Sequence, residues 1–201
     1  MFDFTLKECP KCLANLIDSY NWSGICPKCM EDLRGLMTLE DIERVMRPKR
    51  LSENGFLDEK ESLVELLEED DRVVKEYGLT HKKIVETIIR RLAPDVEKSS
   101  KFLETKDERT IKTVSNNGYY SSQGKYFVET THYKGTQPCP WKDSSTSCDH
   151  FITHQETNKK IILSGLALHL IEKHHFYEGK TRRYRVDPKK IIEFFDIQAG
   201  K

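Results

Sequence analysis

The sequence predicts an α+β protein built from several small modules. Three observations support this fold class: cysteine pairs gather near the N-terminus, apolar residues recur at helical spacing between residues 38 and 92, and β-forming residues alternate from residue 126 onward before helical patterns return. One third of the 201 residues are charged and only 37% are hydrophobic, so one large core is not expected. We divide the chain into a cysteine module (1–35), a helical region (36–94), a polar linker (95–124) and a C-terminal α+β domain (125–201).

The N-terminal module carries two Cys-Pro-Lys-Cys motifs. Cys9 and Cys12 form the first pair, and Cys26 and Cys29 follow after thirteen residues. Two cysteines at this spacing direct their sulfur atoms to one point, and two such turns complete the tetrahedron of thiolates that zinc prefers. Iron is an alternative, since a sulfur tetrahedron accepts both metals. Residues 5–32 resemble a zinc ribbon with rubredoxin-type knuckles, and a unit this small needs its metal in order to fold.

The helical region is predicted to hold three helices. The first spans residues 38–46 and is capped by Thr38. The second spans residues 57–77 and ends at Gly78, and the third spans residues 80–92. The second helix is strongly acidic, because residues 53–76 carry ten acids and three bases. The last two helices and the short turn between them could also be interpreted as a helix-turn-helix motif.

The C-terminal domain is predicted to begin with a strand at residues 126–133. Two more strands are expected at 151–154 and 160–163, joined by a polar turn at 155–159. Ser164 is expected to cap a helix that ends near residue 176. Asp187 and Pro188 then place an N-cap and a first-turn proline at the start of the last helix.

A second set of metal ligands is predicted in this domain. Its members are Cys139, Cys148, His169 and His174, and the two histidines lie on the predicted helix with four residues between them. The stretch resembles the ββα unit of a Cys2His2 zinc finger, which implies one further zinc ion. It departs from that family in the eight residues between its cysteines, where about two to four are usual. It also has twenty residues between Cys148 and His169, where about twelve are typical.

Two alternatives to this ligand set stay open. His150, His154 or His175 could replace one of the four ligands. The cysteines could instead be ordinary core thiols, with the two histidines favoured near the helix end by the helix dipole.

A basic run with interleaved aromatic residues follows the predicted hairpin. Basic groups beside aromatic rings can contact phosphates and stack on bases, so a nucleic-acid surface is one interpretation. The alternatives are that these charges form a solvated surface, or that the patch docks on the acidic helix of the same chain. The candidate nucleic-acid-binding residues are Lys159, Lys160, Lys173, Lys180, Arg182, Arg183 and Arg185.

Catalytic motifs are scarce. The chain has no glycine-rich phosphate loop, no Gly-x-Ser-x-Gly and no His-Glu-x-x-His. Asp149-His150, Asn158 and His169 faintly resemble an HNH nuclease, and that resemblance would make His150 the base and His169 a metal ligand.

The leading hypothesis is therefore a non-enzymatic zinc protein that binds nucleic acid, and the alternative is a protein-interaction adaptor with structural zinc modules. The first residues do not read as a secretory signal, and no apolar run approaches the roughly 20 residues that span a bilayer. We expect a location in the cytoplasm, or in the nucleus of a eukaryote, with no membrane partner. Such compartments are reducing, and this favours metal binding over disulfides for paired cysteines.

Overall fold

A computed structural model describes residues 11, 28, 30, 32, 37–94, 118–121 and 124–199. Cys9, Cys12, Cys26 and Cys29 lie outside the described residues, so the zinc ribbon stays a prediction. In chain order the elements are α1 (Leu39–Met46), α2 (Leu63–Glu76), α3 (His81–Leu92), β1 (Gly118–Tyr120), β2 (Tyr126–Pro138), β3 (Ser145–His154), β4 (Lys160–Ser164), α6 (Ala167–His174) and α7 (Pro188–Phe194).

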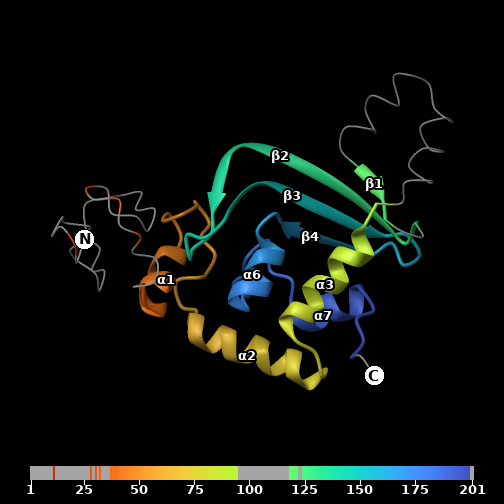
Figure 1. Cartoon of the computed structure of the whole chain (residues 1–201), viewed down its shortest axis with the longest axis horizontal. Coiled ribbons are helices and arrows are strands. Elements are labelled where there is room, and N and C mark those ends of the chain that lie inside the picture. The colour runs from red at the N-terminus through yellow and green to blue at the C-terminus, as the bar shows by residue number, and fades with distance from the viewer. Residues whose placement is uncertain are drawn as a thin grey trace.

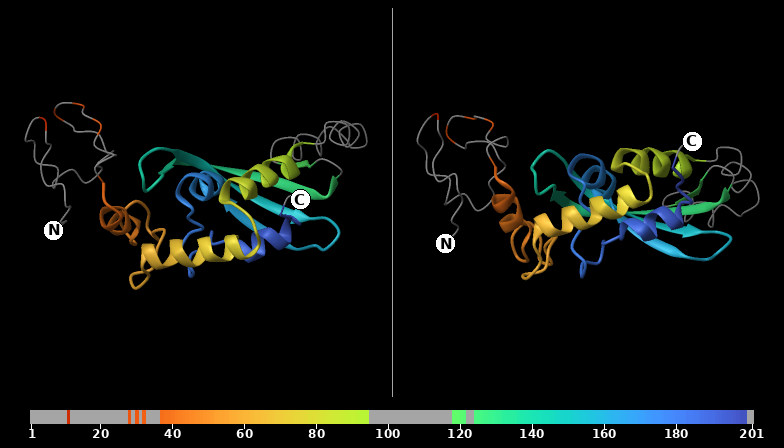
Figure 2. Two further views of the ribbon diagram at one scale, coloured as in Figure 1. Left: turned by 60° about the horizontal axis from the view of Figure 1, so that its bottom comes forward. Right: turned by 90° about the horizontal axis from the view of Figure 1, so that it is seen from below.

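The strands form one antiparallel sheet in the order β1-β2-β3-β4. The predicted α+β class is confirmed, and Figures 1 and 2 show the helices gathered on one side of the sheet. Tyr126 and Val128 alternate with less buried residues along β2, and Val128 lies opposite Ile152 of β3. This period of two turns one apolar face of the sheet toward the helices. None of the helices in the described part of the chain is long and apolar enough to cross a membrane.

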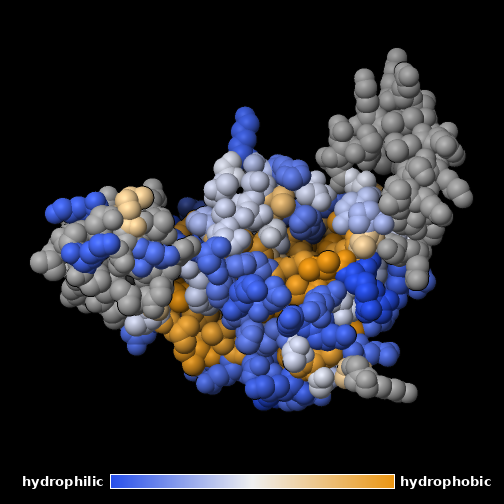
Figure 3. Space-filling model, in the orientation of Figure 1, coloured by the Kyte–Doolittle hydropathy of each residue, from blue (hydrophilic) through white to orange (hydrophobic). Residues whose placement is uncertain are grey.

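Two hydrophobic clusters join the helical region to the C-terminal domain. The larger one packs α3 and α7 against the sheet through residues such as Ile88, Ile152 and Phe195. The second one packs α1 and the start of α2 against the start and end of α6. The regions that the sequence analysis separated at residues 94 and 125 therefore share their cores, and Figure 3 shows hydrophobic residues near both α1 and α3, with hydrophilic residues between them.

Local capping signals explain most helix boundaries. Thr38 and Asp41 form a reciprocal capping box at the start of α1, and Thr80 caps α3 as predicted. Gly78 adopts a φ of +64° after α2, where a residue with a Cβ atom would be strained. The predicted start of the second helix at residue 57 is wrong, because α2 begins at Leu63.

Tertiary contacts explain the late start of α2. The guanidinium group of Arg47 donates hydrogen bonds to the backbone carbonyls of Asp58 and Glu61, and these contacts occupy groups that a longer helix would use. Leu57 is fully buried in the second cluster from this non-helical segment. Burial and side-chain pairing therefore override the helical periodicity of residues 57–62.

The C-terminal domain differs from the prediction in several places. Gly118–Tyr120 form β1 within the predicted linker, and β2 continues to Pro138. The hairpin of β3 and β4 has its turn at 155–159 as predicted, but β3 begins at Ser145, six residues before the predicted start of that strand. Ser164 does not cap a helix: it ends β4, and its hydroxyl donates to the carboxyl group of Glu178. The following helix, α6, has no side-chain cap at its start.

A buried ion pair attaches α2 to the loop before α7. Both nitrogens of the Arg185 fork donate to the two oxygens of Asp70, at 2.5 and 2.7 Å, and Arg185 also donates to the backbone carbonyl of Glu178 at 2.8 Å. Burial raises the pKa of Asp70, and the hydrogen bonds from Arg185 oppose that rise. Such a pair contributes little net stability when intact, but a charge that has lost its partner in this site is strongly unfavourable.

We expect Asp70→Ala to lower the free energy of unfolding by about 3–5 kcal/mol, because it leaves the Arg185 guanidinium buried without its partner. Arg72→Ala is the matched control, since Arg72 and Glu76 form an exposed pair one turn apart on the same helix. Arg72→Ala should lower the free energy of unfolding by about 0.5 kcal/mol or less. Urea unfolding of both variants measures the difference, and equal losses would contradict a special role for the buried pair.

Candidate functional site

Four side chains that can donate to a metal ion meet between the sheet and α6. They are Cys139, Asp143, His169 and His174, and one donor atom from each lies within 4.8 Å of the others. Cys139 and Asp143 belong to the turn between β2 and β3, whereas the histidines lie on α6. These residues could hold a metal ion.

The turn between β2 and β3 places the first two donors. The Cys139 amide donates to the Ser144 carbonyl at 2.8 Å, and the Lys142 amide donates to the Cys139 carbonyl at 2.9 Å. Lys142 has a φ of 63°, which tightens the turn. The backbone amides of Trp141 and Asp143 hydrogen-bond to the Cys139 sulfur. Amides aimed at a sulfur atom stabilise the thiolate form, which is the form that binds metals.

The C-terminal end of α6 places the two histidines. His174 is the last residue of the helix, and His175 ends it in the left-handed region with a φ of 56°. The chain then turns so that Phe176 is fully buried in the same hydrophobic cluster as Cys139. The Trp141 ring stacks on the His174 imidazole with 4.0 Å between centroids and 2° between planes. The packing therefore fixes the orientation of His174 toward the turn.

The contacts within this cluster leave one buried nitrogen unsatisfied. His169 Nε2 lies 2.9 Å from Asp143 Oδ1, and the two atoms form a hydrogen bond. His174 Nε2 lies 3.0 Å from Asp143 Oδ2, but the pair does not have hydrogen-bond geometry, and this buried nitrogen has no hydrogen-bond partner among the described residues. A buried nitrogen without a partner is unfavourable, and a metal ion would supply one.

The pKa shifts of Cys139, Asp143 and His174 are compatible with a metal site. Burial raises the pKa of Cys139 to about 12, and Asp143 raises it as well. Burial lowers the pKa of His174, which keeps its imidazole neutral. Burial alone would raise the pKa of Asp143, but hydrogen bonds from Cys139 and His169 lower it overall. A divalent cation would replace the Cys139 proton and could bind the neutral imidazole of His174 directly.

Asp143 takes the place that the sequence analysis gave to Cys148. The Cys148 sulfur instead lies 3.5 Å from the Thr146 hydroxyl and 3.8 Å from His150 Nε2, and the cluster of four donors does not include it. The structure thus brings together three of the four predicted ligands. The sequence spacing could have indicated Asp143 as the fourth residue of the cluster. Three residues separate Cys139 from Asp143, and about two to four residues separate the first two ligands of a zinc finger.

The three spare histidines lie elsewhere. His150 Nδ1 is 3.0 Å from the Thr130 hydroxyl, and His154 accepts from the amides of the β3–β4 turn. His175 stacks on His81, and these two histidines form a second possible metal group with Asp71. In that group His81 already pairs with Asp71 and with the Tyr177 hydroxyl, so its ring nitrogens have partners without an ion. The proposed nuclease base, His150, and His169 do not share a cluster among the described residues.

Four of the predicted nucleic-acid-binding residues pair with acids of the same chain. Lys180 contacts Glu69 at 2.6 Å and Arg182 contacts Asp58 at 2.7 Å, in addition to the buried pair of Arg185 with Asp70. Lys173 lies 3.6 Å from Glu172, and Lys159 and Lys160 are exposed. Arg183 is exposed over the Tyr184 ring, 5.4 Å from its centroid. The basic run is therefore partly neutralised on the acidic α2 helix and the loop before it.

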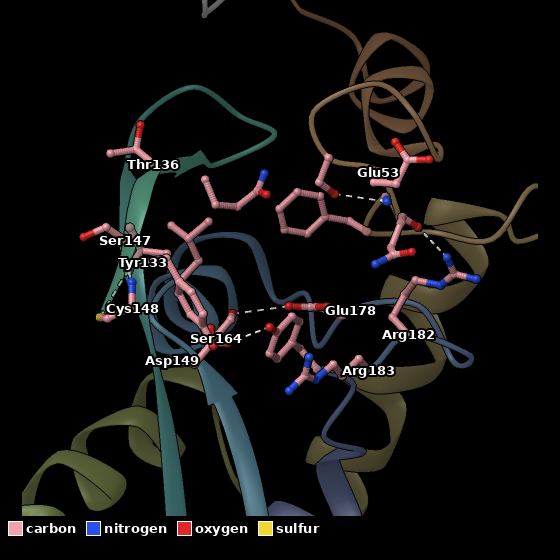
Figure 4. Close-up of a pocket in the computed structure, with 18 of the residues that line it drawn as sticks. Glu53, Tyr133, Thr136, Ser147, Cys148, Asp149, Ser164, Glu178, Arg182 and Arg183 are labelled. Carbon is pink, nitrogen blue, oxygen red and sulfur yellow. Dashed lines mark hydrogen bonds between the residues drawn. The ribbon is translucent and has the colours of Figure 1, made fainter. Parts of the chain in front are cut away.

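A cleft of about 750 Å³ opens beside the β2–β3 arm (Figure 4). Two buried carboxyl groups, Asp149 and Glu178, line it. Asp149 Oδ2 accepts hydrogen bonds from the Tyr133 hydroxyl at 3.0 Å and the Tyr184 hydroxyl at 2.6 Å. Ser164 donates to Glu178 Oε1 at 3.3 Å. Burial raises the pKa of Glu178 to about 8, and the Asp149 charge raises it as well.

No family model matches the chain, and comparisons with curated proteins and with solved structures also find no match.

The raised pKa of Glu178 predicts a pH-dependent stability difference. Its folded pKa of about 8 exceeds the ordinary 4.5, so ionisation in the unfolded state favours unfolding progressively as the pH rises from about 4.5 to about 8. Glu178→Gln cannot ionise. We expect the free energy of unfolding of this variant, relative to that of the wild type, to rise by up to a few kcal/mol between pH 5.5 and pH 9. One pKa unit corresponds to about 1.4 kcal/mol.

Urea unfolding at pH 5.5, 7 and 9 tests this prediction. Glu68→Gln is the control, because it removes a carboxyl group that is exposed on α2. The difference in free energy of unfolding between this control and the wild type should not change with pH. A Glu178→Gln difference that does not grow with pH would show that this carboxyl group titrates normally in the folded protein.

Proposed function

We propose that the protein binds a structural zinc ion through Cys139, Asp143, His169 and His174. The observation that carries this proposal is the convergence of four donors from two distant segments around the unsatisfied nitrogen of His174. Sulfur, imidazole and carboxylate are the ligand types of protein zinc sites. The ion would tie the β2–β3 turn to the end of α6, and this arrangement is that of an elaborated ββα finger in which a carboxylate replaces one cysteine.

A structural role for the metal is favoured over a catalytic one. Four protein ligands fill a tetrahedral shell, whereas catalytic zinc sites keep one position for water or substrate. The donor set also favours zinc over a rubredoxin-type iron centre in this site, since it contains a single sulfur. In the N-terminal module, where the four cysteines offer sulfur alone, we propose a second zinc ion with iron as the alternative.

Metal content per chain tests both sites. We expect two zinc ions in the wild type and one in Asp143→Ala or His174→Ala, because each change removes a ligand of the C-terminal site. Cys148→Ser is the matched control and should keep two. The double variant Cys9→Ser/Cys12→Ser should keep one, and chelation should lower the wild-type melting temperature by about 10 °C.

Other elemental results would contradict the assignment. A wild-type zinc content that Asp143→Ala leaves unchanged would remove the C-terminal site. A loss of zinc in Cys148→Ser without a loss in Asp143→Ala would return the fourth position to Cys148.

We infer that nucleic acid is the partner of this zinc protein, and a protein-interaction adaptor is the second candidate. The exposed side chains of Lys159 and Lys160 support the first candidate, because phosphate contacts need accessible cations. The pairing of Lys180, Arg182 and Arg185 with acids of the same chain favours the second, because it removes cations from the surface. Neither candidate requires an open metal position.

Salt dependence separates the two candidates. For a single-stranded 20-mer, we expect log K to fall linearly with log salt, with a slope of about −0.7 per phosphate contact. Lys159→Ala/Lys160→Ala should reduce that slope by about 1.4 units. Lys82→Ala/Lys83→Ala, which changes two exposed lysines of α3, is the charge-matched control. Fluorescence anisotropy measures the salt slope of each variant. No measurable binding at low salt would favour the adaptor. A reduced slope in the α3 variant alone would favour a helix-turn-helix surface.

A further inference from the structure

The cleft beside the β2–β3 arm is separate from the metal ligands. Its walls come from the end of β2 and the start of β3, from the loop at residues 52–56 and from the loop at residues 178–184. The two loops are joined, because the Gly179 amide donates to the Phe56 carbonyl at 2.9 Å and the Lys180 amide donates to Glu61 at 2.6 Å. Gly179 is required at this contact, since a Cβ atom would lie 2.9 Å from the Phe56 carbonyl oxygen. None of the four metal-binding residues lines the cleft.

The floor of the cleft is polar and mostly buried. Asp149 and Glu178 are only 5% and 4% exposed, and the Ser164 hydroxyl lies between their elements, because Ser164 is paired with Asp149 in the sheet and donates to Glu178. Figure 4 shows Asp149, Ser164 and Glu178 close together at the centre of the site. Burying two carboxyl groups is unfavourable, and a folded protein retains such groups mainly where they serve a ligand or a network.

The floor offers both kinds of hydrogen-bonding group. Tyr133, Tyr184 and Ser164 each carry a hydroxyl, and a hydroxyl can accept a hydrogen bond while it donates another. Glu178 is held in its neutral form near pH 7 and can therefore donate as well as accept. Asp149 adds an acceptor. This mixture suits neutral polar groups such as sugar hydroxyls, amides and the edges of nucleobases, and the aromatic ring of Tyr133, which is 48% exposed, offers a face for stacking.

The rim of the cleft carries two available cations. Arg183 and Lys134 line it, both are exposed, and neither has an ion-pair partner in the described part of the chain. Arg182 also lines the cleft, but its guanidinium group is bound to Asp58 and to the Asn54 carbonyl. The cleft thus combines cations at its mouth with hydrogen-bonding groups and tyrosines at its floor.

We propose that this cleft binds a nucleotide unit, with its phosphate at Arg183 and Lys134 and its sugar or base against Asp149, Ser164 and Glu178. The same chemistry is present in a free mononucleotide and in one unit of a single strand. A bare phosphate lacks the groups that the floor recognises, and a nucleoside lacks the charge that the rim recognises. The site does not depend on the zinc proposal, because its residues are distinct from the metal ligands.

Isothermal titration of the full chain as purified with the four ribonucleoside 5′-monophosphates tests the proposal. We expect at least one nucleotide to bind about tenfold more tightly than inorganic phosphate and about tenfold more tightly than its own nucleoside. Each tenfold difference in affinity corresponds to about 1.4 kcal/mol of binding free energy. Arg183→Ala/Lys134→Ala should weaken that binding about tenfold. Lys189→Ala/Lys190→Ala, which removes two exposed lysines of α7 outside the cleft, should leave it unchanged.

The floor needs a second pair of variants, because Asp149→Asn could disturb folding. Tyr184→Phe keeps the ring and removes the hydroxyl that donates to Asp149, and Ser164→Ala removes the hydroxyl that donates to Glu178. With zinc content and melting temperature held as checks, each should weaken nucleotide binding about three- to tenfold without changing the affinity for inorganic phosphate.

Two results would overturn the proposal. One is the absence of binding by all four nucleotides at millimolar concentration, and the other is nucleotide binding that the rim and floor variants leave unchanged. If the 20-mer still binds with a steep salt dependence in either case, the proposed nucleic-acid function stands without this site. Where nucleotides do bind, competition by a single-stranded 10-mer identifies a unit of a strand as the ligand, and failure to compete identifies the free nucleotide.

Discussion

Cys139 connects the two parts of the structure on which the rest depends. Its side chain is fully buried in the hydrophobic cluster that joins α1, α2 and α6, and its sulfur is also one of the four donors beside Asp143. The same residue therefore holds the tip of the β2–β3 arm against the end of α6. The position of the arm in turn sets one wall of the cleft, so the packing, the cluster of four donors and the cleft share one anchoring point.

Charge separation along the chain has a structural explanation. Residues 1–100 carry a net charge of −5 and residues 101–201 carry +5. In the fold, acids of α2 and of the loop before it face bases of the loop at 178–187, and the pair of Asp70 with Arg185 is buried between them. The opposite charges of the two halves thus help to position the helical region on the C-terminal domain, and they leave only part of the basic run for a partner.

The sequence predicts local features well and tertiary features less well. Thr38, Thr80 and Asp187 cap helices as expected, because capping depends on residues within one turn. The start of α2 could not be predicted, because it depends on Arg47 reaching across to the backbone carbonyls of the following loop. Asp143 was missed although its spacing from Cys139 fits a finger, since carboxylates are frequent at surfaces and few of them bind metals. The cleft floor combines Asp149 of β3 with Glu178 beyond α6, and only the folded chain brings those residues together.

The single sulfur in the four-residue cluster has a consequence for oxidation. A disulfide requires two thiols, so no such bond can form within this cluster if the cation leaves, whereas a finger with two cysteines can close on itself and block reloading. If the proposed zinc ion binds here, one thiolate and one carboxylate would balance its two positive charges, as two thiolates would. Asp143 in the place of a second cysteine would therefore preserve neutrality in the proposed site, and it leaves the cluster with one fewer oxidisable atom.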